Sequence, residues 1–247
     1  MGLMMILGLS AAVVATSFIS GILGMAGGMI LMGILLATMS VGSAMIVHGV
    51  TQLASNGWRA ILWRNSIDRR IVLGYLIGLL LAVALFALVS LVLSRPWVLI
   101  ALGATPFLTY LLPRQLELNV DRPGQPALCG FVCVAVQLLS GVSGPLLDTF
   151  FVPSKLDRKA VVATKAATQS FSHIAKIGYF GWVATSAAEA VTPLLLAALV
   201  VAAVVGTSAS RKVLEAMTDA NFRNWTRRVV LAVGAVYLIS GLWALLK

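Results

Sequence analysis

The sequence contains few charged residues. Asp, Glu, Lys and Arg make up 11% of its 247 residues, whereas soluble domains average about 25%. The stretch 71–93 has no charged residue, and 185–210 has a single carboxylate, Glu189. Each stretch is long enough to cross a hydrocarbon core of about 30 Å as a helix. The shortage of charge therefore excludes a soluble domain and predicts an all-α, polytopic integral membrane protein.

Cysteine is also scarce. The only two cysteines, Cys129 and Cys133, lie four residues apart in an apolar segment. A structural metal site needs more ligands than two, and buried thiols commonly behave as small apolar side chains. We therefore expect no metal site and no other cofactor.

The charge that is present is mostly basic, with a formal net charge of +10. It gathers in connections between apolar segments, at 64–70, 153–159 and 209–228. Basic connections between membrane spans follow the positive-inside rule, so the charge indicates orientation and not a nucleic-acid partner. We expect these connections to be cytoplasmic and the protein to lie in a lipid bilayer, the bacterial cytoplasmic (inner) membrane.

Apolar runs between helix breakers predict the membrane segments. Counting membrane crossings from the basic connections places 113–126 inside as well, so the segment 127–152 would begin and end inside. This segment is broken by SGVSGP at 140–145, which predicts two half-length helices. The first 40 residues show the same pattern, broken by GILGMAGG at 21–28. The predicted segments are 3–20, 22–40, 43–63, 71–93, 97–112, 127–152, 160–182, 187–208 and 228–246.

Two stretches share one polar pattern at a spacing of 117 residues. HGVTQLASNGWR at 48–59 and KAATQSFSHIAK at 165–176 share one order of residue types. Each begins with a basic residue, has Thr-Gln at its fourth and fifth positions and Ser followed by Asn or His at its eighth and ninth, and ends with Arg or Lys. Glycine pairs precede both stretches at the same spacing, Gly24 with Gly27 and Gly141 with Gly144. This pattern predicts an internal duplication.

The duplication predicts two repeats, 1–112 and 127–247, joined by a cytoplasmic linker at 113–126. Each repeat would contain a broken, re-entrant-like helix hairpin followed by three transmembrane helices. Because three crossings is an odd number, the second repeat would be inverted relative to the first. Inverted repeats with broken helices are typical of secondary transporters, whose substrate site lies between the repeats near the membrane midplane.

The polar residues of each stretch fall on one helix face. Positions 48, 51, 52, 55, 56 and 59 share a face at 3.6 residues per turn, as do the positions 117 residues later. Polar side chains in a membrane normally face the bundle interior or a water-filled cavity. We therefore expect the two polar stripes to face each other.

Together these features resemble the sulfite exporter TauE/SafE family of membrane transporters, over nearly the whole chain. The family's glycine-rich motif, of the type G-x-G-G-G-x-x-x-x-P, is similar to GMAGGMILMG at 24–33 and GVSGPLLDTF at 141–150. The resemblance implies transport of a small anion, commonly sulfite, a sulfonate or an organosulfur carboxylate, and no enzymatic activity. Five positions of the motifs depart from the family pattern, and these departures leave the particular substrate open. The five are Ala26, Gly33, Ser143, Pro145 and Phe150.

The glycine breaks and the polar stripes are the candidate substrate site. Half-helices that begin at the breaks would offer free N–H donors to an anion, although small residues also serve close helix packing. The Thr-Gln pairs could donate hydrogen bonds to the anion, or join helices to one another. The predicted substrate-binding residues are Gly24, Gly27, Gly28, His48, Thr51, Gln52, Ser55, Ser143, Gly144, Lys165, Thr168, Gln169 and Ser172.

Charged and titratable residues on the stripes suggest further roles. Lys165 lies too deep to reach the membrane surface, so it either pairs with Asp148 or faces the anion. Protons could couple to transport at Asp148, His48 or His173, since histidine titrates near neutral pH. Arg59 and Lys176 lie nearer the helix ends, where they either draw anions into the vestibule or extend toward the membrane surface, and we favour the second.

Three other functions compete with a secondary transporter. An anion channel of the same architecture would use the same site, and no sequence feature separates the two. Gly141-Val142-Ser143-Gly144 is similar to the serine motif of an intramembrane hydrolase with His173 as base, but duplication also explains that motif. A metal transporter is disfavoured because the basic stripes would repel cations. The sequence leaves the oligomeric state open, with a homodimer as one option.

Overall fold

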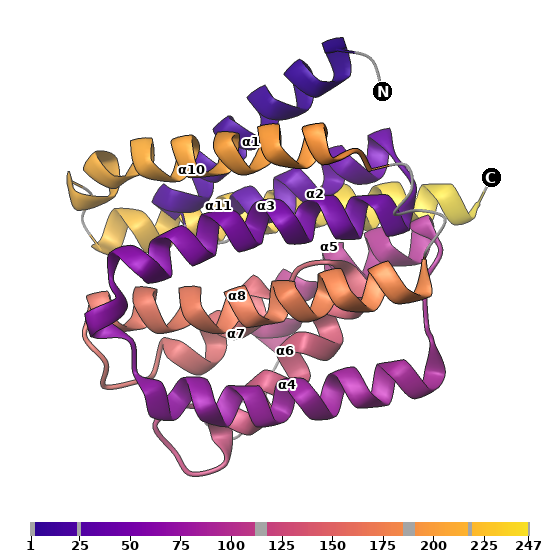
Figure 1. Ribbon diagram of the computed structural model, residues 1–247. Helices are drawn as coiled ribbons and strands as arrows, with labels where there is room; N and C mark the ends of the chain where they lie inside the picture. The colour runs from indigo at the N-terminus through magenta and orange to yellow at the C-terminus, as the bar shows by residue number, and fades with distance from the viewer. Residues whose placement is uncertain (1–2, 24–25, 112–117, 185–190, 217–218, 247) are drawn as a thin grey trace.

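The structure is a computed structural model that describes residues 3–23, 26–111, 118–184, 191–216 and 219–246. The described residues form helices and no strands, as predicted (Figure 1). The helices are α1 (Leu3–Leu23), α2 (Ala26–Thr38), α3 (Val41–Leu62), a 3₁₀ turn η1 (Arg64–Ser66), α4 (Arg69–Val89), α5 (Arg95–Leu111), α6 (Gln125–Ser140), α7 (Gly144–Phe151), α8 (Arg158–Val183), α10 (Pro193–Ala216) and α11 (Asp219–Leu245).

Side-chain caps set the starts of the two polar helices. The Ser40 hydroxyl accepts a hydrogen bond from the backbone N–H of Ser43 at the start of α3. The Asp157 carboxylate accepts one from the backbone N–H of Ala160 at the start of α8. Such caps satisfy N–H groups that the first helical turn leaves unpaired. The two caps are 117 residues apart, which is the spacing of the polar stripes.

Both predicted breaks interrupt helices, but they divide their segments differently. In the second segment, α6 ends at Gly141, whose φ of 84° is one that glycine adopts without strain, and α7 begins at Gly144. α6 has 16 residues and α7 has 8, both short of the roughly 20 needed for a span. In the first segment α1 already has 21 residues. The prediction of two half-length helices therefore holds for the second break only.

The last two helices extend further than predicted. α10 continues to Ala216 and α11 begins at Asp219, whereas the apolar runs end at 208 and begin at 228. No glycine or proline interrupts 207–232, so the helices run on into polar sequence. Among the described residues, four helices are long and apolar enough to cross a membrane, within Leu3–Ile22, Arg69–Val89, Pro193–Ser210 and Arg227–Leu245.

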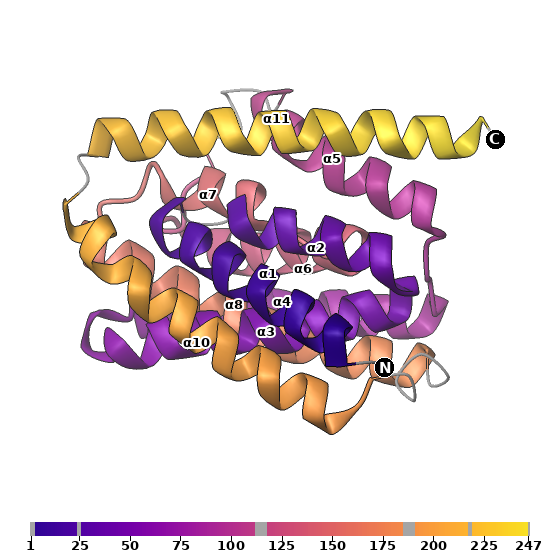
Figure 2. The same cartoon turned by 90° about the horizontal axis from the view of Figure 1, so that it is seen from above.

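The helices of the two halves are interleaved. α10 packs against α1 and α3, while α4 packs against α6 and α8 (Figures 1 and 2). α3 packs against α8, and α5 against α11. Exchanging α1 through α5 with α6, α7, α8, α10 and α11 in order converts these pairings into one another. The inverted repeat stays a prediction, and this arrangement is one that it would produce.

Contacts between connections define the two ends of the bundle. At one end, the backbone N–H of Asp68 donates to Thr164, and that of Lys155 donates to Asp121. This end, which we call the basic end, therefore brings together the connections that the positive-inside rule assigns to the cytoplasm. At the opposite end, the Arg95 guanidinium donates to the carbonyl of Met39.

Candidate functional site

The structure brings the two polar stripes together. α3 and α8 pack against each other in opposite directions, so that the start of α3 meets the last turns of α8. The Nζ of Lys176 lies 2.7 Å from the Nδ1 of His48. The imidazole rings of His48 and His173 lie 5.7 Å apart, edge to face.

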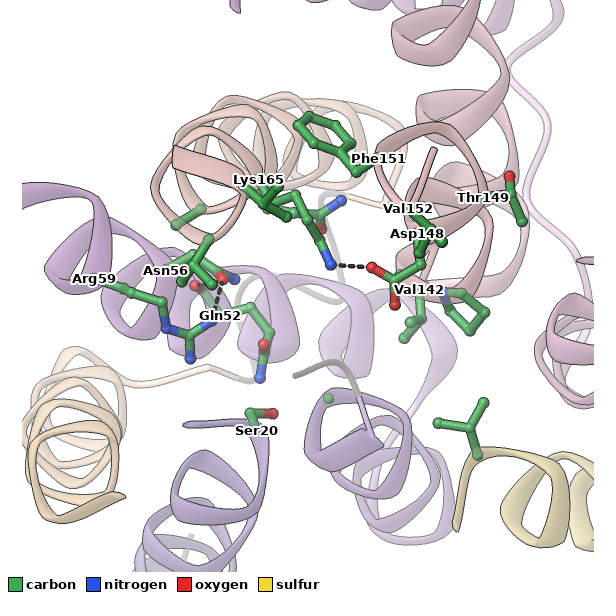
Figure 3. Close-up of a pocket in the computed structure, with 18 of the residues that line it drawn as sticks. Ser20, Gln52, Asn56, Arg59, Val142, Asp148, Thr149, Phe151, Val152 and Lys165 are labelled. Atoms are coloured by element: carbon green, nitrogen blue, oxygen red, sulfur yellow. Dashed lines mark hydrogen bonds and ion pairs between the residues drawn. The ribbon is translucent and has the colours of Figure 1, made fainter. Parts of the chain in front are cut away.

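A cavity of about 670 Å³ lies beside this helix pair (Figure 3). It is lined by residues of α1, α2, α3, α7 and α8, and also by residues of α5 and α11. It reaches the surface near the basic end, where the exposed residues Val152, Pro153 and Arg158 line it. Its volume is within the range of about 300–1,000 Å³ that is typical of ligand pockets. Its polar lining residues include Ser20, His48, Gln52, Asn56, Arg59, Asp148, Thr149, Lys165, Gln169 and His173.

The wall formed by α1 and α3 carries hydrogen-bond donors that have no acceptor. The amide nitrogen of Gln52, the Nη2 of Arg59 and the hydroxyl of Ser20 are all buried without a partner. Gln52 is 6% exposed and Ser20 4%. Leaving a buried donor unsatisfied costs roughly 1–3 kcal/mol. A ligand that supplied acceptor oxygens here would remove this cost.

The opposite wall carries an ion pair. The Lys165 ammonium donates to the Asp148 carboxylate (Figure 3), as one of the two sequence-based interpretations predicted. The pair neutralises the deepest cation of this wall. Arg59 forms no ion pair with any carboxylate of the described residues, and its Nη1 makes only a long bond of 3.5 Å to Asn56. On the α3 wall, Arg59 is therefore a cation that no described carboxylate neutralises.

The inner end of the cavity is closed by a chain of hydrogen bonds. The Nε2 of His48 donates to the carbonyl of Gly28, at 2.9 Å, because a carbonyl can only accept. Its Nδ1 accepts from Lys176, which also donates to the carbonyl of Gly141, at 3.0 Å. Lys176 is fully buried, so the prediction that it extends toward the membrane surface is wrong. Its two acceptors keep it inside.

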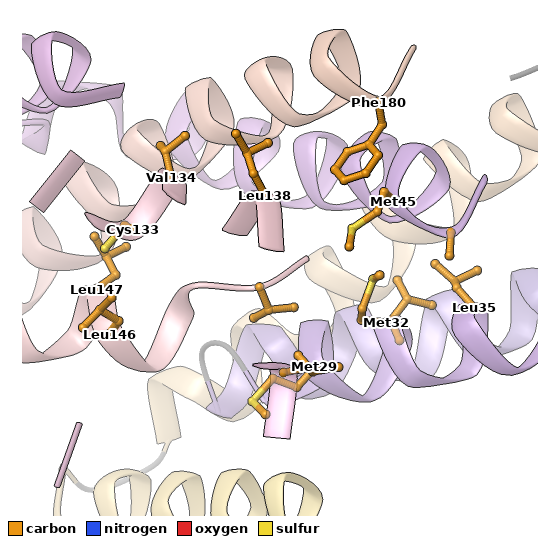
Figure 4. Packing of buried hydrophobic residues seen from close by; sticks show 14 of the residues in the cluster. Met29, Met32, Leu35, Met45, Cys133, Val134, Leu138, Leu146, Leu147 and Phe180 are labelled. Carbon is orange, nitrogen blue, oxygen red and sulfur yellow. The ribbon is translucent and has the colours of Figure 1, made fainter. Parts of the chain in front are cut away.

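An apolar layer lies one helical turn beyond this chain, toward the opposite end. Met32 of α2, Met45 of α3 and Phe180 of α8 meet there (Figure 4). The sulfur atoms of both methionines also lie where a side chain at Gly141 would need space. We call these three residues the methionine plug. Together with the His48–Lys176 contact, the plug separates the cavity from the opposite end.

A family model for the sulfite exporter TauE/SafE family matches residues 9–237. The chain belongs to this family. The match confirms the resemblance drawn from the glycine motifs, and it identifies a membrane transporter of sulfite or related sulfur-containing anions. Comparisons with curated proteins and with solved structures give no match.

Only part of the predicted site lines the cavity of this TauE/SafE protein. Gly28, His48, Gln52, Gly144, Lys165 and Gln169 do so, as do Asp148 and His173. Gly27 does not, because it packs so closely on α1 that a side chain there would overlap the carbonyl of Thr16. At Gly27 the packing interpretation therefore applies. Gly24 lies outside the described residues.

The short hydroxyl residues of the stripes do not line the cavity. Thr51 and Thr168 donate to carbonyls of their own helices. The hydroxyl of Ser55 lies 2.7 Å from that of Thr207 on α10, and Ser172 lies at the same distance from Tyr75 on α4. Ser55 and Ser172 therefore join helices, whereas the hydroxyls of Thr51 and Thr168 are satisfied within their own helices.

Ser143 lies just behind the cavity wall. Its hydroxyl donates to the Oε1 of Gln137, at 3.0 Å, and the Nε2 of Gln137 lies 3.2 Å from the Nδ1 of His173. Sequence patterns did not single out Gln137 or Ser20, because both lie outside the repeated stretch. Arg59 does belong to the repeated pattern, so the sequence could mark it as a residue of the cavity.

Proposed function

We propose that this protein is a secondary transporter that carries a small, sulfur-containing organic anion through the central cavity by alternating access. One observation carries the proposal, the three unpartnered donors of Ser20, Gln52 and Arg59 on one wall of the cavity. Neutral donors beside a single cation suit an oxyanion such as a sulfonate or a carboxylate. The transport of sulfur-containing anions by the family agrees with this chemistry.

The size and lining of the cavity favour an organic anion over sulfite itself. An inorganic anion of four heavy atoms needs the space of roughly four waters, at about 30 Å³ each. The cavity holds about 670 Å³. Apolar side chains, among them Val142, Pro145 and Phe151, line the part near α7 (Figure 3). A sulfonate or thio-carboxylate with a short apolar body would fill this space.

The closed inner end favours a transporter over a channel. A channel needs a continuous path, whereas here the His48–Lys176 contact and the methionine plug separate the cavity from the opposite end. The cavity would then face the cytoplasm, since it reaches the surface near the basic end. Movement of the halves against each other would open the other side.

The geometry gives little support to a serine hydrolase. Ser143 donates to Gln137 and not to His173, so the contact between nucleophile and base that such enzymes need is missing. Gln137 lies between the two residues.

Binding of defined anions to the detergent-purified protein tests the proposal. The panel contains sulfite, thiosulfate, sulfoacetate, sulfolactate and short thio-carboxylates, with choline and divalent metals as controls. We expect an organosulfur anion to raise the unfolding temperature of the wild type and of Thr51→Ala equally, and that of Gln52→Ala by less. Thr51 is a matched control because its hydroxyl bonds to its own helix. An equal response of both variants would refute the site.

Transport in proteoliposomes then separates the transporter from the channel. A transporter shows faster uptake of labelled anion when unlabelled anion is present on the far side, because the loaded site returns sooner. A channel shows no such acceleration. Uptake without acceleration would therefore favour the channel.

A further inference from the structure

A line of four polar side chains runs from the cavity to a buried histidine. The Nε2 of Gln169 donates to the Ser143 hydroxyl at 3.4 Å, and that hydroxyl donates to Gln137. The amide of Gln137 in turn donates to the Nδ1 of His173 at 3.2 Å. Every donor in this line points toward His173. The line, which we call the Gln169–His173 relay, therefore ends on a ring nitrogen that carries no proton.

The direction of the relay fixes the state of His173. Because its Nδ1 accepts, the neutral ring carries its proton on Nε2. His173 is 3% exposed but lines the cavity, so water in the cavity can exchange protons with it. The titratable groups that act on it directly are His48 of α3 and Lys176 of its own helix, and the Asp148–Lys165 pair lines the same cavity.

We propose that His173 takes up a proton when the anion binds, and that the Gln169–His173 relay couples the two events. The inference rests on the proposed function, since it concerns the same cavity and the same anion. It assigns to His173 the coupling of protons to transport, and to Gln137 and Ser143 the positioning of the donors that the anion meets.

Counting donors and acceptors explains the coupling. A second proton on His173 turns Nδ1 from an acceptor into a donor, which faces the amide N–H of Gln137. The Gln137 amide must then turn and present its oxygen to His173 and its N–H to Ser143. Ser143 can accept from both glutamines, but its own O–H loses its acceptor. The relay thus gains a surplus donor at Ser143, just behind the cavity wall beside the lining residue Gly144, and an oxygen of the bound anion supplies the acceptor.

Charge acts in the same direction. A protonated His173 adds a positive charge at the cavity, which favours the anion, and the bound anion favours the proton. Such linkage is reciprocal. If the coupling is complete, anion affinity falls about tenfold for each pH unit of increase, over the pH range in which His173 is neutral in the free protein and protonated in the anion complex.

The other two candidates for proton coupling, His48 and Asp148, lack such a line of hydrogen bonds to the cavity. His48 donates from Nε2 to Gly28 and accepts from Lys176 at Nδ1, so a second proton would face the lysine donor and not the cavity. Asp148 is engaged with Lys165. Neither residue is joined to a cavity-lining glutamine by the described side-chain hydrogen bonds.

Anion-linked proton uptake measures the coupling directly. An organosulfur anion that binds is added to purified protein in weak buffer with a pH indicator, at several pH values. We expect uptake of up to about one proton per bound anion in the wild type and in the control Thr51→Ala, whose hydroxyl bonds to its own helix. We expect loss of uptake in His173→Gln and in Gln137→Leu, with anion binding retained at low pH in the latter.

Each result decides the inference. Uptake that survives in His173→Gln would overturn the assignment to His173. Uptake that is unchanged in Gln137→Leu would overturn the relay, and this variant keeps the test valid if His173→Gln does not fold. Anion binding without proton uptake would refute the coupling but leave the proposed function intact. Absence of anion binding would remove both.

Discussion

The polar stripes of α3 and α8 share one sequence pattern but differ in how their side chains are satisfied. On α3, the amide of Gln52 and the guanidinium of Arg59 keep donors without acceptors at the cavity. On α8, Lys165 pairs with Asp148, and Gln169 and Lys176 each donate to another residue. The neighbours of a repeated residue, more than its position in the repeat, decide its role. The α3 stripe would bind the anion. The α8 stripe would couple proton uptake to anion binding and close the inner end of the cavity.

Among the variants that test this difference between the two stripes, Arg59→Gln should change anion affinity most. The variant removes the unpaired cation of the α3 wall, and hydrogen bonds to charged groups contribute about 1.5–3 kcal/mol. We expect anion affinity, measured by calorimetry, to fall roughly 10- to 100-fold. Arg59→Lys retains the charge and should lose less. Equal losses in the two variants would show that charge does not hold the anion.

Replacing Asp148 by Asn should make the α8 wall resemble the α3 wall. The change leaves Lys165 unpaired at the cavity, where its side chain is 17% exposed. We expect affinity for the anion to rise about tenfold, which corresponds to about 1.4 kcal/mol, and doubly charged anions to gain most. Lys165→Met, with Asp148 left alone, should weaken binding. Weaker binding in Asp148→Asn would mean that the ion pair itself positions the site.

Leucine at Gln52 or at Gln169 should separate binding from stability. Gln52→Leu removes an amide nitrogen that has no partner, so the unfolding temperature should not fall, while anion affinity should drop about fivefold for one lost hydrogen bond of roughly 1 kcal/mol. Gln169→Leu also takes a donor from Ser143, so its unfolding temperature should fall. Thermal melts with and without the anion measure both effects. Identical melts would contradict the comparison.

Alanine at Ser55 or at Ser172 should have the smallest effect. Each serine joins its stripe to a neighbouring helix, through Thr207 or Tyr75. Hydrogen bonds between membrane helices contribute on average about 0.6 kcal/mol. We expect a small and similar loss of stability in the two variants, with anion affinity unchanged. A loss of affinity in either variant would place that hydroxyl in the binding site after all.

The sequence predicted the helical membrane fold well, since apolar runs and breakers mark most spans. It placed the ends of α10 and α11 poorly, because hydropathy marks the apolar part of a helix and not where the helix ends. Pattern analysis found Gln52 and Gln169, whose long side chains reach the cavity. It could not exclude Thr51 and Thr168, because only the folded helix shows that a short hydroxyl bonds to its own backbone.

Lys176 shows a second limit of sequence analysis. Its place on the stripe was visible, but its acceptors are a carbonyl at a helix break and a histidine from the other half. Those partners become known only when α3, α6 and α8 are packed together. Gln137 is a similar case, because it precedes the break and belongs to no repeated pattern.

The methionine plug has a consequence for how the closed end opens. Methionine side chains are unbranched and flexible, and their sulfur is polarisable, so they fill irregular space and repack readily. A seal built from Met32 and Met45 against Phe180 can therefore part and form again without a unique interlocking shape. Both methionines are fully buried in the described structure, so an oxidant can reach their sulfur atoms only when the seal parts. Methionine oxidation would therefore report how often the closed end opens.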